Sequence, residues 1–198
     1  LFKQHGYFTQ AMGKIFSGDE RELDPASWSV PEILRQDGWR NYALPRGEAP
    51  GKQAPWEAAD VSDEGYSDGK LAALAVETLG RMKAEAKPFF LAVGFFKPHL
   101  PFNAPKRYWD LYDRARLPAL DPRRPAGAPE IAFHDSREVL GLPGPGRIAP
   151  TPELVAEMRH GYFANISYLD AQLGKVLDAL DRGGRASDTI VVFVGDHG

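Results

Sequence analysis

An apolar run near the C-terminal end of the chain, in the segment TIVVFVGDHG, constrains the fold most strongly. Residues 190–194 are apolar and mostly β-branched, which is typical of a strand buried on both faces of a sheet. Asp196 and His197 follow where this run stops. Because ligands of open α/β sheets bind beyond the carboxyl ends of the strands, we expect both residues to lie at a functional site. The alternative is that Asp196 caps a turn and His197 is an ordinary loop residue.

A second apolar run covers residues 89–96 and continues directly into Lys97, Pro98 and His99. The apolar spacing of residues 67–86 predicts a helix before it, and residues 39–44 predict a strand before that helix. This order indicates a βαβ unit with parallel strands.

If both apolar runs are parallel strands of one sheet, Lys97, His99, Asp196 and His197 meet at the same edge. The prolines on both sides of His99 fix the backbone direction, which suits a side chain that must be aimed. The alternative is that Lys97 is solvated and His99 packs under a loop.

The rest of the chain predicts helices and loops around such a sheet. We expect a short strand at residues 6–9 with a loop at Gly13 and Lys14, and short helices at 29–38 and 104–112. Residues 117–150 are dense in proline and glycine and predict a long irregular excursion, either a lid or a plain surface insertion. The predicted fold class is α/β, with a mostly parallel central sheet flanked by helices.

The longest helix is predicted to begin after Thr151, which would cap it, with Pro152 in the first turn. Its apolar residues predict one buried stripe made of Val155, Met158, Tyr162, Ile166, Leu169, Leu173, Val176 and Leu180. Asn165, Ile166 and Ser167 match the N-glycosylation pattern, but we interpret this match as accidental because Ile166 belongs to the stripe.

Composition excludes several classes of function. The 198 residues are 43% hydrophobic and 26% charged, as in ordinary globular proteins, and the net charge of -3 argues against a nucleic-acid partner. No apolar run approaches the roughly 20 residues of a membrane span. The sequence has no cysteine, so it predicts neither a disulfide nor a cysteine redox centre, and the compartment cannot be inferred from cysteine usage.

The candidate site residues point to one kind of chemistry. Asp196 suits a divalent metal ion, His197 a metal ion or a hydrogen bond, and Lys97 an anionic oxygen. His99 could donate a proton to a leaving oxygen near neutral pH, and Lys14, beside Gly13, is a further anion contact. Together they indicate metal-assisted hydrolysis of an anionic ester, although no nucleophile is identified.

Four segments of this sequence resemble the sulfatase family, in its iduronate-2-sulfatase-like branch, within the alkaline phosphatase superfamily. They are GKIFSG at 13–18, PFFLAVGFFKPHLPF at 88–102, YFANISYLDAQLGKVLDAL at 162–180 and TIVVFVGDHG at 189–198. The resemblance implies a Ca²⁺-dependent hydrolase of sulfate esters, acting on a small molecule or a glycan. It also implies a formylglycine nucleophile made in a Cys/Ser-x-Pro-x-Arg motif.

By the same resemblance, Asp196 and His197 match two metal ligands. Lys14 matches the lysine that steadies the formylglycine and the sulfate, and His99 matches the histidine near the scissile oxygen. Lys97 is a candidate on the sulfate side. Ser17 stands where the family usually has a second histidine, so a base role at that position is in doubt. Calcium prefers oxygen ligands, which leaves the identity of the metal open.

The nucleophile motif and the family's paired aspartates do not occur in this sequence. We therefore expect residues 1–198 to be the central part of a single sulfatase domain, without the nucleophile region and the C-terminal subdomain, and to be inactive alone. A phosphodiesterase or phosphatase of the same superfamily, and a non-catalytic binding domain with this fold, remain the alternatives. The resemblance favours a periplasmic, extracellular or lysosome-like location, and oligomeric state is not predicted.

Overall fold

The structure is a computed structural model that describes residues 1–16, 24–33, 41–44, 54–84, 87–118, 121, 123–133 and 151–195. The chain divides into two compact units. The first comprises Leu1–Gln36, Ser67–Phe96 and Asp170–Gly198, and the second comprises Asp37–Tyr66 and Lys97–Leu169.

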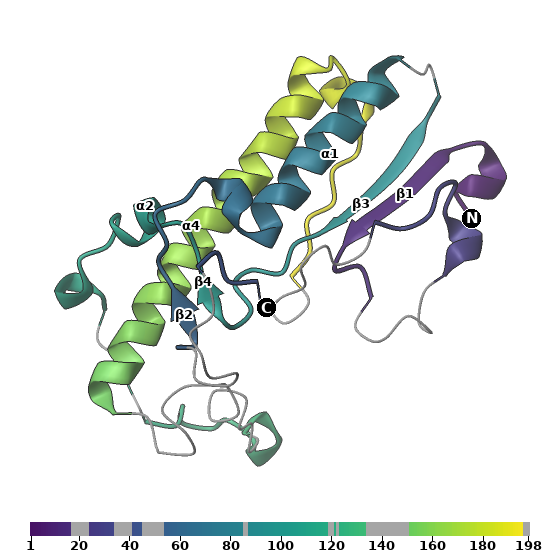
Figure 1. The fold of residues 1–198 in the computed structure, drawn as a ribbon. Coiled ribbons are helices and arrows are strands. Elements are labelled where there is room, and N and C mark those ends of the chain that lie inside the picture. The colour runs from purple at the N-terminus through teal and green to yellow at the C-terminus, as the bar shows by residue number, and fades with distance from the viewer. Residues whose placement is uncertain are drawn as a thin grey trace. The chain divides into compact units, whose positions relative to one another are not determined.

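The first unit is built on a parallel pair of strands joined through a helix. Strand β1, Phe8–Gly13, pairs in parallel with strand β3, Phe89–Gly94, from Phe8 opposite Phe89 to Gly13 opposite Gly94. Helix α1, Ser67–Ala84, lies between them in the sequence and covers one face of the pair (Figure 1). The prediction of parallel strands flanked by helices is confirmed, as are the helix after residue 67 and the strand after residue 88.

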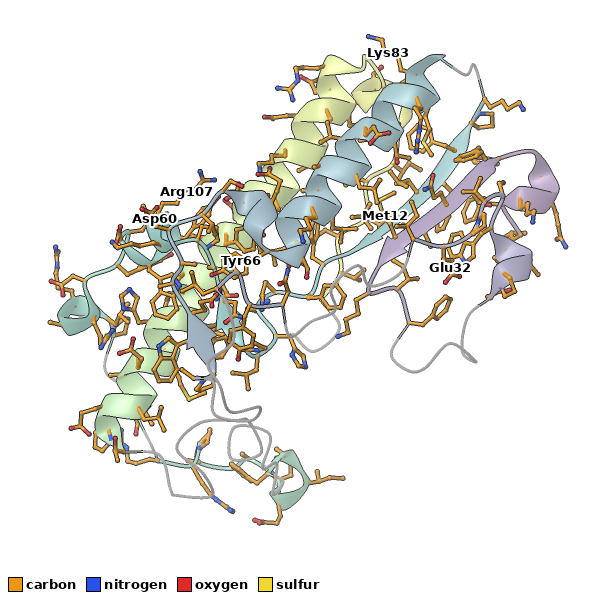
Figure 2. The ribbon with its side chains drawn as sticks, viewed as in Figure 1. Met12, Glu32, Asp60, Tyr66, Lys83 and Arg107 are labelled. Carbon is orange, nitrogen blue, oxygen red and sulfur yellow. The ribbon has the colours of Figure 1, made fainter. Side chains whose placement is uncertain are left out.

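Alternation along the two strands explains the core of this unit. Met12 points from β1 toward α1 and packs with Leu71 and Ala75 of that helix (Figure 2). Leu91 and Val93, which lie opposite Gln10 and Met12, join the same cluster. Phe90 therefore faces the other side of the pair, where its ring stacks on Phe2 at 4.5 Å between centroids.

The partner predicted for β3 was wrong. Residues 41–44, the described part of the strand expected at 39–44, are not in a strand, and β3 pairs with β1 instead; residues 39 and 40 lie outside the described residues. The carboxylate of Glu57 instead accepts hydrogen bonds from the backbone N–H groups of Ala43 and Leu44, at 2.6 and 3.3 Å. Because a side chain satisfies these donors, this segment needs no strand ladder.

The helix predicted at 29–38 is also wrong for its described part, since residues 29–33 run extended along the free edge of β1. The N–H of Ile33 donates to Ala11 O at 3.0 Å, and the N–H of Gly13 donates to Ile33 O at 2.9 Å. Pro31 has no N–H to offer a helix, whereas a strand edge uses only alternate donors. Residues 34–38 lie outside the described part of the chain.

The second unit contains a smaller parallel pair. Strand β2, Trp56–Glu57, pairs with β4, Phe102–Asn103, and the four-residue helix α2, Lys106–Trp109, falls within the helix predicted at 104–112. Leu100 and Met158 form a small core with Trp56, Phe102 and Leu154 around them.

Helix α4, Pro152–Arg182, confirms the long helix predicted after Thr151. Thr151 caps it as expected, because its Oγ1 accepts a hydrogen bond from the N–H of Leu154 at 3.2 Å. Residues at both ends of the predicted stripe, Met158 and Leu180, are buried.

The middle of that stripe was placed on the wrong face. Tyr162 and Ile166 are 43% and 40% exposed, while Asn165 and Tyr168 are fully buried. The hydroxyl of Tyr168 donates to Asp63 O at 2.9 Å. Polar side chains can be buried when they are hydrogen-bonded, so the buried face of this helix includes polar residues. A stripe chosen from apolar residues alone therefore missed it.

The strand predicted at residues 190–194 is not formed. These residues are in no strand, and their side chains are 55–91% exposed. β1 is already paired on both edges, with β3 and with residues 29–33, and no described strand pairs with residues 190–194. An apolar, β-branched sequence needs a neighbouring strand before it can be buried in a sheet.

Short 3-10 helices complete the described chain, at Lys3–His5, Pro25–Ser27, Asp63–Gly65, Arg114–Arg116, Glu130–Ala132 and Ala186–Asp188. Within the excursion predicted at 117–150, the structure describes residue 121 and residues 123–133 after residue 118. Apart from the 3-10 helix Glu130–Ala132, these residues form neither a helix nor a strand, which agrees with the prediction of an irregular segment. Among the described helices, none has both the length and the apolar composition of a membrane span.

Candidate active site

Lys14 lies at the carboxyl end of β1, where two glycines let the strand ends close on each other. Gly13 has a φ of 76°, and the N–H of Lys14 donates to Gly94 O at 2.6 Å. A Cβ on Gly94 would lie 1.9 Å from Lys14 O, and one on Gly13 would lie 2.2 Å from Gly94 O. The position of the Lys14 backbone therefore depends on glycine at both sites.

The carboxyl end of β3 is tied to the start of α1 at the same edge. The carboxylate of Asp68, which is buried, accepts the N–H of Phe96 at 3.0 and 3.2 Å. A small cavity at this edge is lined by Gly13, Lys70 and Phe96, with Ile33, Ser67, Leu71 and Leu74. Lys70 was not predicted as a site residue, and its helical position in the sequence carries no signal for one.

Lys97 and His99 lie together in the loop of residues 97–101, in the second unit. The Lys97 ammonium donates to Pro101 O at 2.6 Å and to His99 O at 3.4 Å, and the residue is only 8% exposed. The peptide bonds before Pro98 and Pro101 are both cis. The structure thus brings together the two candidates of this loop and turns the lysine toward its own backbone.

The imidazole of His99 is held by a short hydrogen bond between Nδ1 and Leu100 O, at 2.6 Å. A carbonyl oxygen can only accept, so the proton of this bond is on Nδ1. Nε2 is then the ring nitrogen that is not engaged in this hydrogen bond. Leu100 is itself buried against Met158, which anchors the carbonyl that holds the ring.

The elements around this loop are fixed by a buried polar network. The hydroxyl of Tyr66 donates to Glu57 of β2 at 2.8 Å, and burial, followed by this bond, raises the pKa of Tyr66 far above its ordinary value. Asp63 accepts Arg107 and the Tyr108 hydroxyl at 2.5 and 3.0 Å. Figure 2 shows Tyr66 just before α1 and Arg107 on α2.

The charges of this network follow from burial at Tyr108 and from hydrogen bonding at Arg107. Burial raises the pKa of Tyr108, and the hydrogen bond with Tyr108 is the main reason why the pKa of Arg107 is raised. Tyr108 is therefore neutral and Arg107 is charged near neutral pH. These hydrogen bonds join residues 63–66 to β2 and α2 within the second unit.

The remaining predicted site residues, Asp196 and His197, lie outside the described residues, as does Ser17. The strand that was expected to place Asp196 and His197 at a sheet edge is not formed by residues 190–194, and the position of both residues stays a prediction. Within the described ranges, no group of three or more His, Asp or Glu side chains could hold a metal ion. The described residues therefore supply no metal centre by themselves.

The N-glycosylation pattern at residues 165–167 falls on a buried side chain. Asn165 has no exposed surface, and its Nδ2 donates to Gly161 O within α4 at 2.8 Å. This placement agrees with the interpretation of the pattern as accidental.

The family model named Sulfatase matches residues 1–198. The chain belongs to the sulfatase family. Iduronate 2-sulfatase of Homo sapiens is 34% identical, and the alignment covers 100% of this chain and 39% of that protein. The mouse (Mus musculus) iduronate 2-sulfatase is 37% identical over the same shares. Choline-sulfatase of Rhizobium meliloti is 29% identical over 99% of this chain and 41% of its own length.

Solved structures share the fold. The phosphonate monoester hydrolase of Agrobacterium radiobacter superposes with a TM-score of 0.64 and 24% identity, over 94% of this chain and 44% of that chain. The phosphonate monoester hydrolase of Silicibacter pomeroyi gives a TM-score of 0.60 and 20% identity, over 94% and 44%. The predicted fold class is confirmed, and this chain spans less than half of each of these proteins.

Proposed function

We propose that the protein containing this chain hydrolyses sulfate esters, and that residues 1–198 are the central part of its catalytic domain. The match of the sulfatase family model to the whole chain carries this proposal. The geometry of the described residues supports it, because a lysine ends β1 and a histidine with an assigned tautomer lies in the loop after β3.

In this proposal, Lys14 and His99 have separate roles. The Lys14 ammonium binds a sulfate oxygen and offsets its negative charge. As the S–O bond to the alcohol breaks, its electron pair stays on the alcohol oxygen, and protonated Nε2 of His99 gives that oxygen its proton. The sulfur at the same time forms a bond to the nucleophile, which this sequence does not identify, so the step leaves a sulfated nucleophile, a neutral alcohol and a neutral imidazole.

Membership of the sulfatase family implies a divalent metal ion, which would offset charge on the sulfate when bound. Asp196 and His197 are its proposed ligands in this chain, and Ca²⁺ is the proposed ion on the basis of the family resemblance. The proposed nucleophile, a formylglycine, lies outside this chain. The location in the periplasm, outside the cell or in a lysosome-like compartment stays a prediction.

The proposed substrate is a sulfated sugar. Two relatives at 34% and 37% identity are named iduronate 2-sulfatases, and both align over 100% of this chain. A phosphorus ester is the second candidate, because the solved phosphonate monoester hydrolases share the fold and a relative named as a multifunctional alkaline phosphatase superfamily protein is 30% identical.

Kinetics of the intact protein with matched esters decide between these candidates. We expect kcat/KM for 4-nitrophenyl sulfate to exceed that for 4-nitrophenyl phenylphosphonate and bis(4-nitrophenyl) phosphate. His99→Gln should lower kcat by about 10²-fold or more on esters with poor leaving groups, since a general acid contributes that much. A preference for either phosphorus ester, with normal folding, would replace the sulfatase proposal by the second candidate.

A further inference from the structure

Lys97 is a charged side chain in an unusual setting for a substrate ligand. It is 8% exposed, whereas His99, two residues later in the same loop, is half-buried. A buried ammonium is destabilising unless its protons find acceptors. Two carbonyl oxygens of its own loop are among its acceptors, Pro101 O at 2.6 Å and His99 O at 3.4 Å.

The composition of the loop explains why a side chain takes this place. Pro98 and Pro101 lack N–H groups, so the loop has few backbone donors for its own carbonyls. The side chains of Lys97 and His99 supply donors to three of these carbonyls, and Pro101 O also accepts the N–H of Asn103 at 2.8 Å. Lys97 Nζ binds the carbonyls of His99 and Pro101, and His99 Nδ1 binds the carbonyl between them, that of Leu100.

Three consecutive carbonyls are thus held by two side chains of the same loop. The hydrogen bond that fixes the His99 ring ends on Leu100 O, and the carbonyls on both sides of it are held by Lys97. The Leu100 side chain is packed in the core with Met158, which fixes the loop from the other side. The direction of His99 Nε2 therefore depends on Lys97.

We propose that Lys97 is a positioning residue that clamps the loop 97–101 and so aims His99 Nε2, and that it is not a sulfate ligand. This inference rests on the proposed function for its kinetic consequence. It assigns Lys97 a role different from the substrate contact expected from the sequence, because its ammonium lies on carbonyl oxygens of the loop.

The two roles differ in which kinetic constant they change. If Lys97 aims the general acid, Lys97→Met slows turnover most for esters whose leaving oxygen needs a proton. We expect kcat on phenyl sulfate to fall at least about tenfold more than kcat on 4-nitrophenyl sulfate, with KM and the inhibition constant of inorganic sulfate changed less than about twofold. In a His99→Gln background, Lys97→Met should have little further effect.

Two matched variants complete the kinetic test in the intact protein. Lys106→Met removes an exposed lysine that binds Asp110 at 2.5 Å, and we expect it to leave both substrates unaffected. Lys97→Arg keeps a cationic donor and should restore part of the lost turnover on phenyl sulfate. If circular dichroism shows that Lys97→Met is misfolded, the turnover of the two esters is compared in Lys97→Arg instead.

The opposite pattern would overturn the proposal. A Lys97 variant that raises KM and the sulfate inhibition constant, and slows both esters equally, would make Lys97 a sulfate ligand. If the wild-type protein hydrolyses no sulfate ester, the proposed function fails. The clamp is then tested by ¹⁵N NMR of the His99 ring. The His99 signals are assigned as those that are missing from the spectrum of His99→Gln. Loss of the Nδ1–H tautomer in Lys97→Met supports the clamp, and an unchanged tautomer in that variant overturns it.

Discussion

At the scale of single residues, partners rather than residue types decide what each polar group does. Tyr66 and Tyr162 illustrate this, since Tyr66 is buried and donates to Glu57 at 2.8 Å, while Tyr162 is 43% exposed. Lys97 and Lys106 differ in the same way, one buried on carbonyl oxygens and the other exposed beside Asp110. Residues of one type therefore provide matched pairs for experiment.

Tyr66 predicts a loss of stability at alkaline pH. Its folded pKa is raised above the ordinary value of about 10, so the unfolded chain ionises first as pH rises. The contribution of its hydroxyl is complete below about pH 10 and declines above it. Tyr66→Phe should lower the free energy of unfolding by about 1 kcal/mol at pH 8. The difference in this free energy between wild type and Tyr66→Phe should become smaller toward about pH 11.

Urea unfolding of wild type and Tyr66→Phe at both pH values measures this gap. Tyr162→Phe is the control, and its difference from wild type should stay small and flat, because that side chain is exposed. A Tyr66→Phe gap that is constant with pH would contradict the assigned cause.

At the scale of elements, close contact between β1 and β3 positions the first candidate residue of the site. Their ends meet as a Gly13 and Gly94 pair, which lets Lys14 N reach Gly94 O at 2.6 Å. Larger residues at either position would push the strand ends apart. The site therefore depends on two residues that carry no chemistry of their own.

Gly94→Ala tests this dependence. Its Cβ would lie 1.9 Å from Lys14 O, so we expect a loss of roughly 2 kcal/mol or more in the free energy of unfolding, and lower kcat/KM on aryl sulfates. Gly80→Ala in α1 is the control, because nothing lies within 4 Å of its added Cβ. That change should stabilise by about 0.5–1 kcal/mol. Equal effects of the two substitutions in urea unfolding would refute the close-contact argument.

At the scale of the whole molecule, this chain supplies only part of what hydrolysis needs. It spans 39% of the iduronate 2-sulfatases that it matches, and its sequence holds no Cys/Ser-x-Pro-x-Arg motif. In the proposed reaction Lys14 binds the sulfate and His99 protonates the leaving oxygen, and neither is the nucleophile. Covalent catalysis without a nucleophile loses most of its rate, by up to about 10⁶-fold.

We therefore predict that residues 1–198 made alone do not hydrolyse 4-nitrophenyl sulfate above the buffer rate, whereas the intact protein does. The measurement is nitrophenolate release at equal protein concentration, with folding of the short chain checked by circular dichroism. Turnover by the short chain would show that its own residues include the nucleophile.

The candidate site was predicted from the sequence in part. Lys97 and His99 were proposed because the prolines of their loop follow an apolar run, and the structure places both in one loop. Lys14 was proposed because it lies beside a glycine, and it follows the last residue of β1. The site roles of these three residues, and of Asp196 and His197, stay predictions. The direction of the Lys97 ammonium could not be foreseen, because carbonyls of residues 99 and 101 have no signature in the sequence.

The sequence by itself determined the α/β class, the helix that begins at residue 67, the strand that begins at residue 89 and the long helix after Thr151. Each follows from periodicity, capping or a breaking proline, which act over neighbouring residues. Only the tertiary structure decided that residues 29–33 line β1, that residues 41–44 are held by Glu57, and that residues 190–194 are exposed. The physical reason is that an apolar or β-branched pattern favours burial and extension, while strand pairing needs a partner with open hydrogen-bonding groups, and that partner is distant in the chain.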